Sequence, residues 1–321
     1  MSDEVHNRQK RKWPRIVLLS MGSLSVIGLL LYACWLHPQY WIEGYMEREI
    51  SQGNIHQAIC GKNYKEIYQD APLALVMPYI DRAMEYGYYD EAAGFINHFL
   101  RQNSNELTEY ESEKLQAYQT LIARGTKTEV NYKQMLVDRE RSPYTVPDEK
   151  IVEKLNALLL DSDYDPSLLY QEMADMTDQD DQKIIYLEEA YRCDPNNMEA
   201  ACQAAGLSWT NGYMTKAREL LESAYQRQKD NFEVVRNLAM LELLDGNADK
   251  GYEYAKKAYD ISPDGDYAAD IYYIAMLESG RLEKTRENIY NIQFRYPYIR
   301  VDLIGHYIEG KTELKDIFTY E

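Results

Sequence analysis

The residues whose types and spacing could do chemistry begin with a run of carboxylates, Asp161, Asp163 and Asp165, followed by Glu172. Alternate acidic residues closed by a later glutamate are typical of calcium-binding loops between two helices. Pro166, however, stands where such a loop needs a glycine. The alternative is a helix start, in which Asp165 caps the first turn and Pro166 is the first helical residue. The proline favours the helix start, and we expect neither a metal site nor a cofactor.

The four cysteines are Cys34, Cys60, Cys193 and Cys202. None forms a C-x-x-C pair, and no histidine lies near one at metal-ligand spacing. Cys193 and Cys202 flank a predicted turn between helices, so a disulfide between them is one interpretation. The other is that Cys60, Cys193 and Cys202 are small buried residues.

Catalytic signatures are missing from the chain. The five histidines are scattered, and no nucleophile elbow, phosphate-binding loop or dinucleotide fingerprint occurs. We therefore expect no catalytic residues and predict that the protein is not an enzyme. Net charge is −18, and beyond residue 15 the chain carries 30 basic residues against 51 acidic ones. Such a body should be repelled by phosphate backbones, so nucleic acid is not an expected partner.

The elements that carry these residues start with an N-terminal anchor. Residues 1–15 form a basic tail, and residues 16–36 are 21 consecutive uncharged residues. At about 1.5 Å per residue they span roughly 30 Å, the thickness of a bilayer's hydrocarbon core. The sequence predicts a single transmembrane helix that acts as a signal anchor. Because the basic cluster precedes it, the N-terminus should be cytoplasmic and the body extracytoplasmic, at the cell surface.

An alternative anchor is a lipid on Cys34. Leu31 to Cys34 reads LYAC, which resembles the lipidation motif of bacterial lipoproteins, although Tyr32 is bulkier than that motif usually carries. Either anchor would hold the body at the outer face of a membrane.

Glycine, alanine and proline recur in the body with a period of 34 residues. Gly212, Gly246 and Gly280 are spaced by this period, as are Gly53 and Gly87. Glycine can take the left-handed conformation that ends a helix. Small residues follow each turn and let two helices approach closely, and prolines end the second helix. The pattern therefore predicts repeated helical hairpins and an all-α fold.

This helix–turn–helix period resembles the tetratricopeptide (TPR) repeat. The matching segments are NGYMTKARELLESAYQRQKDN, DGNADKGYEYAKKAYDISPD and SGRLEKTRENIYNIQFRYP. The family's late small residue matches Ala190, Ala224 and Ala258. The family's early alanine is replaced by Gly251 and Thr285. The resemblance implies a divergent TPR-like solenoid.

Applying the period divides the body into four parts. These are TPR-like repeats 1–3 over 39–140, an inserted joint with a short helix over 141–163, repeats 4–7 over 164–299 and a C-terminal capping helix over 300–321. Leu121 and Asp178 occupy the glycine positions of the third and fourth repeats, which are degenerate.

The resemblance also implies where a partner would bind. In TPR-like arrays the first helix of each repeat lines a concave groove that holds a polypeptide. By this resemblance the groove residues are Trp209, Arg236, Asn237, Tyr267 and Asp270. The expected function is a protein-binding scaffold or chaperone within a membrane or envelope complex. The alternative is a lipid-anchored protein that binds a glycan or a small solute in a Tyr-rich groove.

Overall fold

A computed structural model describes residues 39–68, 70–102, 107–142, 146–283 and 296–318. Every regular element in these ranges is an α-helix, so the chain is all-helical as the sequence predicts. The predicted basic tail 1–15, the apolar segment 16–36 and Cys34 lie outside the described residues. Among the helices that are described, none is both long enough and apolar enough to cross a bilayer.

The first helices form two hairpins, here called the N-terminal array. They are α2 (Gln39–Gln52), α3 (Ile55–Cys60), α4 (Tyr64–Ile67), α5 (Leu73–Glu85) and α6 (Tyr89–Gln102). Gly53 and Gly87 have φ angles of 83° and 80°, which confirms the left-handed residue predicted at each turn. The N–H of Gly53 donates to the carbonyl oxygen of Ile50, and that of Asn54 to Glu49, both at 2.9 Å. These bonds satisfy carbonyl groups at the end of α2.

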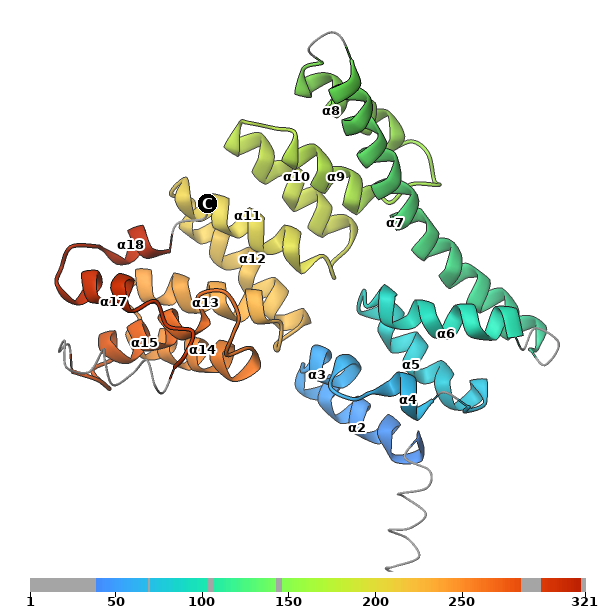
Figure 1. Ribbon diagram of the computed structural model, residues 1–321, viewed down its shortest axis with the longest axis horizontal. Coiled ribbons are helices and arrows are strands. Elements are labelled where there is room, and N and C mark those ends of the chain that lie inside the picture. Colours follow the sequence, from blue (N-terminus) through green and yellow to red (C-terminus); the bar gives the residue numbers. More distant parts are fainter. Residues whose placement is uncertain (1–38, 69, 103–106, 143–145, 284–295, 319–321) are drawn as a thin grey trace, which may run out of the picture.

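The predicted hairpin over 107–140 is instead one helix, α7 (Glu109–Arg141), of 33 residues. It begins with a capping box in which Thr108 Oγ1 accepts from the Glu111 N–H at 3.3 Å and Glu111 Oε2 accepts from the Thr108 N–H at 2.9 Å. Leu121 stands where the other hairpins have their glycine, and leucine favours helix, so nothing ends α7 midway. At about 1.5 Å per residue α7 is about 50 Å long, and it forms one long edge of the molecule in Figure 1.

Beyond α7, the helix predicted within the joint is α8 (Asp148–Leu158). A second series of hairpins, here called the C-terminal array, follows. Its regular part comprises α9 (Pro166–Asp175), α10 (Asp180–Cys193), α11 (Met198–Thr210), α12 (Met214–Arg227), α13 (Phe232–Leu244), α14 (Ala248–Ile261) and α15 (Ala268–Glu278). Helices α10, α12 and α14 begin 34 residues apart. Residues 284–295, assigned by the sequence to the seventh repeat, lie outside the described residues.

Small residues let neighbouring helices of the C-terminal array approach closely. Ala190, Ala224 and Ala258 are buried at the same place in α10, α12 and α14. Gly251 explains one departure from the repeat pattern, because a Cβ there would lie 2.8 Å from Cγ of Leu243. The α13–α14 hairpin therefore packs too tightly for the alanine that the pattern leads one to expect.

The predicted capping helix over 300–321 is two short helices, α17 (Val301–Ile308) and α18 (Leu314–Ile317). Gly310, with φ of 69°, ends α17 where a continuous helix was expected. Helix α18 packs on α13. The described end of the chain is therefore a further hairpin, not one capping helix.

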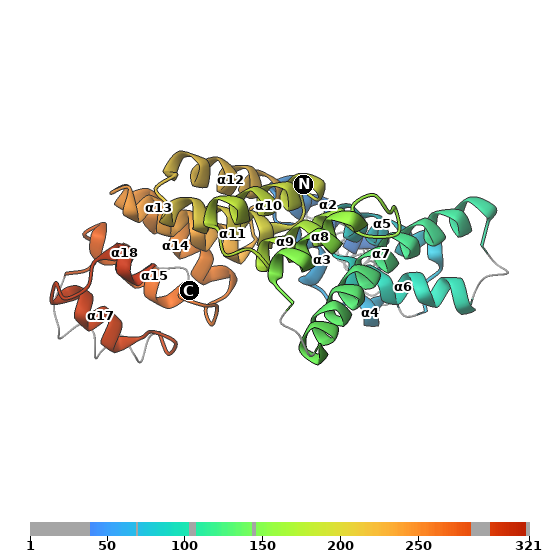
Figure 2. The same cartoon turned by 90° about the horizontal axis from the view of Figure 1, so that it is seen from above.

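The two arrays meet although they are far apart in sequence. The long α7 and the turn at α8 direct the chain back, and the end of α12 comes beside α3 and α5 (Figures 1 and 2). Lys229 N–H donates to the carbonyl oxygen of Gly53 at 2.8 Å. The described helices therefore form a closed arrangement instead of one extended row.

Candidate binding site

The predicted groove residues on α13 and α11 are engaged within the molecule. Asn237 is buried, and its Oδ1 accepts from Nε of Arg236 at 3.2 Å. The Arg236 guanidinium also lies 5.5 Å from the ring centre of Phe232. Trp209 is partly buried and packs against two apolar clusters. These contacts stabilise the hairpins themselves.

The other two predicted groove residues hold α17 in place. The buried carboxylate of Asp270 accepts from the backbone N–H of Arg300 at 2.8 Å and from its Nε at 2.6 Å. Tyr267 precedes α15 with a left-handed φ of 63°, and its ring centre lies 4.0 Å from the Arg300 guanidinium carbon. Arg300, which the sequence assigned to the C-terminal cap, therefore contacts both Tyr267 and Asp270.

The carboxylate run forms a helix start. Asp165 Oδ1 accepts from the N–H groups of Ser167 at 2.9 Å and Leu168 at 3.3 Å, and Pro166 is the first residue of α9. This confirms the capping interpretation. Asp163 is turned away from it and pairs with Lys127 of α7 at 2.8 Å. The described part of the chain holds no group of three or more acidic, histidine or cysteine side chains that could bind a metal ion.

The described cysteines are all free thiols, so the disulfide considered for Cys193 and Cys202 is wrong. Cys193 is exposed at the end of α10, whereas Cys202 is buried in the middle of α11. Burial raises the pKa of the Cys202 thiol. Cys60 is half-buried at the end of α3.

Cys60 lies at a hollow in the N-terminal array that no motif had indicated. The second helix of the first hairpin breaks, because α3 ends at Cys60 and α4 begins only at Tyr64. In the second hairpin the corresponding helix, α6, runs unbroken for 14 residues. The break leaves a hollow of about 840 Å³ between α3, α4, α5 and α6. It is lined by Ile59, Cys60, Lys62, Asn63, Tyr64, Lys65, Tyr68, Asp70, Tyr79, Asp90, Glu91, Gly94, Phe95 and His98.

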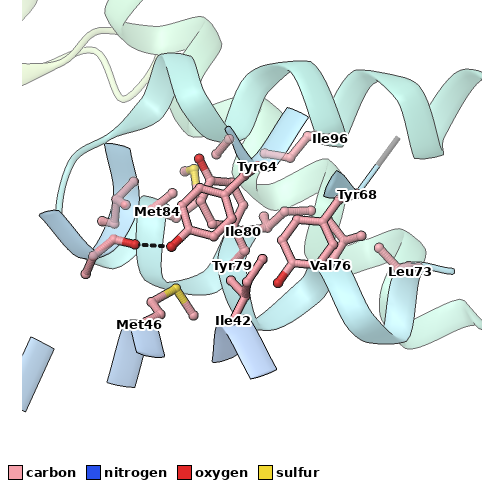
Figure 3. Packing of buried hydrophobic residues seen from close by; sticks show 14 of the residues in the cluster. Ile42, Met46, Tyr64, Tyr68, Leu73, Val76, Tyr79, Ile80, Met84 and Ile96 are labelled. Atoms are coloured by element: carbon pink, nitrogen blue, oxygen red, sulfur yellow. Dashed lines mark hydrogen bonds between the residues drawn. The ribbon is translucent and has the colours of Figure 1, made fainter. Parts of the chain in front are cut away.

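The floor of the hollow is aromatic. The ring centres of Tyr64 and Tyr79 are 4.4 Å apart, and Phe95 meets Tyr79 edge-on at 5.5 Å and Tyr68 at 6.2 Å. Figure 3 shows the rings of Tyr64 and Tyr68 side by side, close to Tyr79 and to apolar side chains of α2 and α5, with the Tyr64 hydroxyl donating to the Ala58 carbonyl oxygen. Burial raises the pKa of Tyr68 to about 12 and raises those of Tyr64 and Tyr79 further, so all three phenols are neutral at physiological pH.

The rim of the hollow is polar and carries both signs of charge. Cys60 Sγ lies 3.6 Å from Glu91 Oε1, and burial together with Glu91 raises the pKa of this thiol to about 12. The thiol is therefore protonated and a poor nucleophile at neutral pH. Lys62 also lines the hollow, and its ammonium group lies 4.8 Å from the ring centre of Tyr45. Exposed Asp90 and Glu91 follow one another on α6.

One wall of the hollow includes a glycine, Gly94, and is open there because glycine has no side chain. Gly94 lies in the interior of α6, where no left-handed backbone requires a glycine. A Cβ built on it would have no atom within 4 Å. Since glycine costs about 1 kcal/mol relative to alanine in a helix interior, the space is kept at a cost in stability.

The signal for this site in the sequence is a broken helix pattern. Gly61 and Asn63 interrupt the stretch that should be the second helix of the first repeat, and tyrosines follow at Tyr64 and Tyr68. A Cβ on Gly61 would lie 2.3 Å from the carbonyl oxygen of Gln57, so the break needs a glycine. Spacing alone could not show that α6 leaves room beside them.

Comparison with known proteins adds no family to this description. No protein-family model matches the chain, and no curated protein matches it with significance.

Proposed function

We propose that this protein is a membrane-anchored scaffold that binds a polypeptide segment in the hollow of its N-terminal array. The observation that carries the proposal is the hollow itself, with an aromatic floor, a rim of mixed charge and an open glycine wall. A volume of about 840 Å³ lies within the range of sites that enclose ligands of several residues or of drug size. An apolar side chain would contact Phe95, which is partly exposed, while the peptide backbone would meet the polar rim.

The burial of the tyrosines favours a polypeptide over a glycan. Stacking on a sugar requires an exposed ring face. Tyr64, Tyr68 and Tyr79 are only 3%, 2% and 3% exposed, because their faces pack on one another and on apolar neighbours. The floor therefore offers apolar edges but no free ring face to a sugar.

The helical hairpins and the N-terminal segment support the rest of the proposal. The 34-residue period and its left-handed glycines resemble those of TPR repeats, a class that presents extended binding surfaces to partners. The apolar segment 16–36, preceded by a basic cluster, supports a membrane anchor with the body outside the cytoplasm. A lipid on Cys34 would leave this topology unchanged. The acidic body would favour a partner of positive charge.

The test is a selection of random linear peptides on the full-length chain in detergent micelles, run beside a panel of glycans. A photoreactive residue would then replace Asn63 on the rim or, as a control far from the hollow, Leu160, which is 93% exposed. We expect the selected peptides to crosslink from position 63 and not from position 160. Equal crosslinking from both positions would contradict the proposed site. Enrichment of glycans alone would favour the solute-binding alternative.

A further inference from the structure

The contact between the two arrays is made of turns, not of helix faces. Residues 53–57 and 85–88 of the N-terminal array meet residues 194–197 and 227–231 of the C-terminal array, and this contact is called the seam below. Its partners are up to 174 positions apart in sequence. The turns belong to the periodic hairpins, so the seam joins repeating parts of both arrays.

At the first end of the seam, Asp230 caps a helix of the other array. Its Oδ1 accepts from the N–H of His56 at 3.1 Å and its Oδ2 from the N–H of Gln57 at 2.8 Å. Asn54, the residue that precedes α3, makes no capping bond with its own side chain. Asp230 is only 6% exposed. A buried carboxylate on the first N–H groups of a helix is a favourable cap, because the donors would otherwise be unpaired.

At the second end, the C-terminal array satisfies the last carbonyl group of α5. The carbonyl oxygen of Glu85 accepts from Arg227 at 2.9 Å and from Asn196 at 3.0 Å. The Arg227 guanidinium also lies 4.7 Å from the ring centre of Tyr86. Gly87 lets the two arrays approach closely, since a Cβ there would lie 2.8 Å from Cβ of Asn196.

The apolar cores of the described residues do not cross the seam. One buried cluster contains residues of α2 to α7 only, between positions 42 and 122. The other clusters contain only residues from position 132 onward. Opening the seam would therefore exchange its hydrogen bonds and the Arg227–Tyr86 ring contact with water, without separating any described apolar cluster between the two arrays. Such contacts separate at much lower cost than packed cores.

Helix α3 connects the seam to the hollow. Its first N–H groups are capped by Asp230, and its last residues, Ile59 and Cys60, line the hollow. It has only six residues. A helix this short is not stable by itself, so its conformation depends on its cap and its packing.

From this arrangement we propose that the seam opens and closes as a unit and thereby controls the wall of the hollow. With the seam closed, Asp230 holds α3 as a helix and the hollow has the shape described here. With the seam open, the start of α3 loses its cap, and the helix is then held only by the packing of Ile55, Ala58 and Ile59 in the N-terminal cluster, so its last residue, Cys60, becomes easier to expose. Only the effect on ligand binding rests on the proposed function, because the motion itself needs no ligand.

Cys60 reports the motion directly. We would measure alkylation of each thiol of the full-length chain by iodoacetamide, resolved by mass spectrometry of its peptides. In Asp230→Ala, Cys60 should be alkylated about tenfold faster than in the wild type, while the rate at the buried Cys202 should not change. Asp249→Ala is the matched control, because it removes an exposed carboxylate that pairs with Arg281 away from the seam.

Two results would overturn the proposal. An unchanged rate at Cys60 would show that the seam does not control α3. Equal acceleration at Cys60 and Cys202 would show that the whole molecule unfolds and that the seam does not open by itself. If Asp230→Ala does not fold, Arg227→Ala and Asp230→Asn replace it, with the same expected difference between the two thiols and a smaller fold-change.

The link to binding is tested separately with a peptide from the selection described above. Bound peptide should slow Cys60 alkylation in the wild type and should bind about tenfold more weakly to Asp230→Ala, because coupling between two sites is reciprocal. Should no peptide bind the wild type, the proposed function fails, while the alkylation rates still decide whether the seam opens. Peptide binding that is equal in both proteins would overturn the control of the hollow by the seam.

Discussion

Replacement of Gly94 by leucine should raise the stability of the protein and abolish binding in the hollow. Gly94 lies inside α6, and the space where its Cβ would stand is empty to 4 Å. Leucine is about 0.8 kcal/mol more favourable than glycine in a helix interior. For a body of this size such a gain corresponds to a rise in melting temperature of about 2 °C.

The leucine side chain would occupy the volume that a ligand needs, so peptide affinity should fall at least tenfold. Unfolding would lower both stability and binding, so a rise in stability with a loss of binding separates filling of the site from unfolding. Thermal melting followed by circular dichroism gives the stability, and titration calorimetry with a selected peptide gives the affinity.

Gly44→Leu is the matched control. Gly44 is exposed in the interior of α2, its Cβ would also have nothing within 4 Å, and it does not line the hollow. The control should gain the same stability and keep full affinity. Undiminished peptide binding by Gly94→Leu would refute the hollow as the binding site. A loss of more than about 1 kcal/mol of stability would show that leucine meets a packed surface rather than open space.

Three further results are expected. Burial raises the pKa of Glu242, but hydrogen bonds from Arg218 and other donors outweigh it and lower this pKa. Glu242→Ala should therefore lower the free energy of unfolding in urea by about 3 kcal/mol. In the wild type, the stability that Glu242 contributes should be lost as the pH falls through its lowered pKa. Burial raises the pKa of Glu172 to about 7 from 4.5, so the folded state binds an extra proton between these values and stability should fall as the pH rises through that window; Glu172→Gln should remove this slope in urea midpoints measured at several pH values. A thiol reagent should label Cys193 rapidly and Cys202 only on unfolding, and prior reduction should change neither rate. Labelling that requires prior reduction would instead support a disulfide between these two residues.

Several features of the fold follow from the sequence because they depend on residues close together in the chain. The glycines that end first helices are predictable, since only glycine takes a left-handed φ without strain, and Gly53, Gly87 and Gly212 all do so. The start of α9 is predictable from Asp165 and Pro166 by the same local chemistry. The pattern predicted the third repeat wrongly. Leu121 stands there in place of the glycine, and the predicted hairpin is one long helix, α7.

The candidate site and the seam were decided by the tertiary structure. A broken helix after Cys60 is visible in the sequence, but the sequence does not show that α5 and α6 complete the hollow, with Gly94 in its lining. The cap of α3 comes from Asp230, which lies 174 positions from His56. A repeat pattern reflects contacts between helices that are neighbours in the sequence. Contacts between the two arrays depend instead on the length and direction of α7, and these depend on many residues together and not on a short motif. The sequence by itself therefore determined the glycine-ended hairpins and the start of α9, but not the long α7. Only the tertiary structure placed a pocket and a polar seam at the two ends of α3.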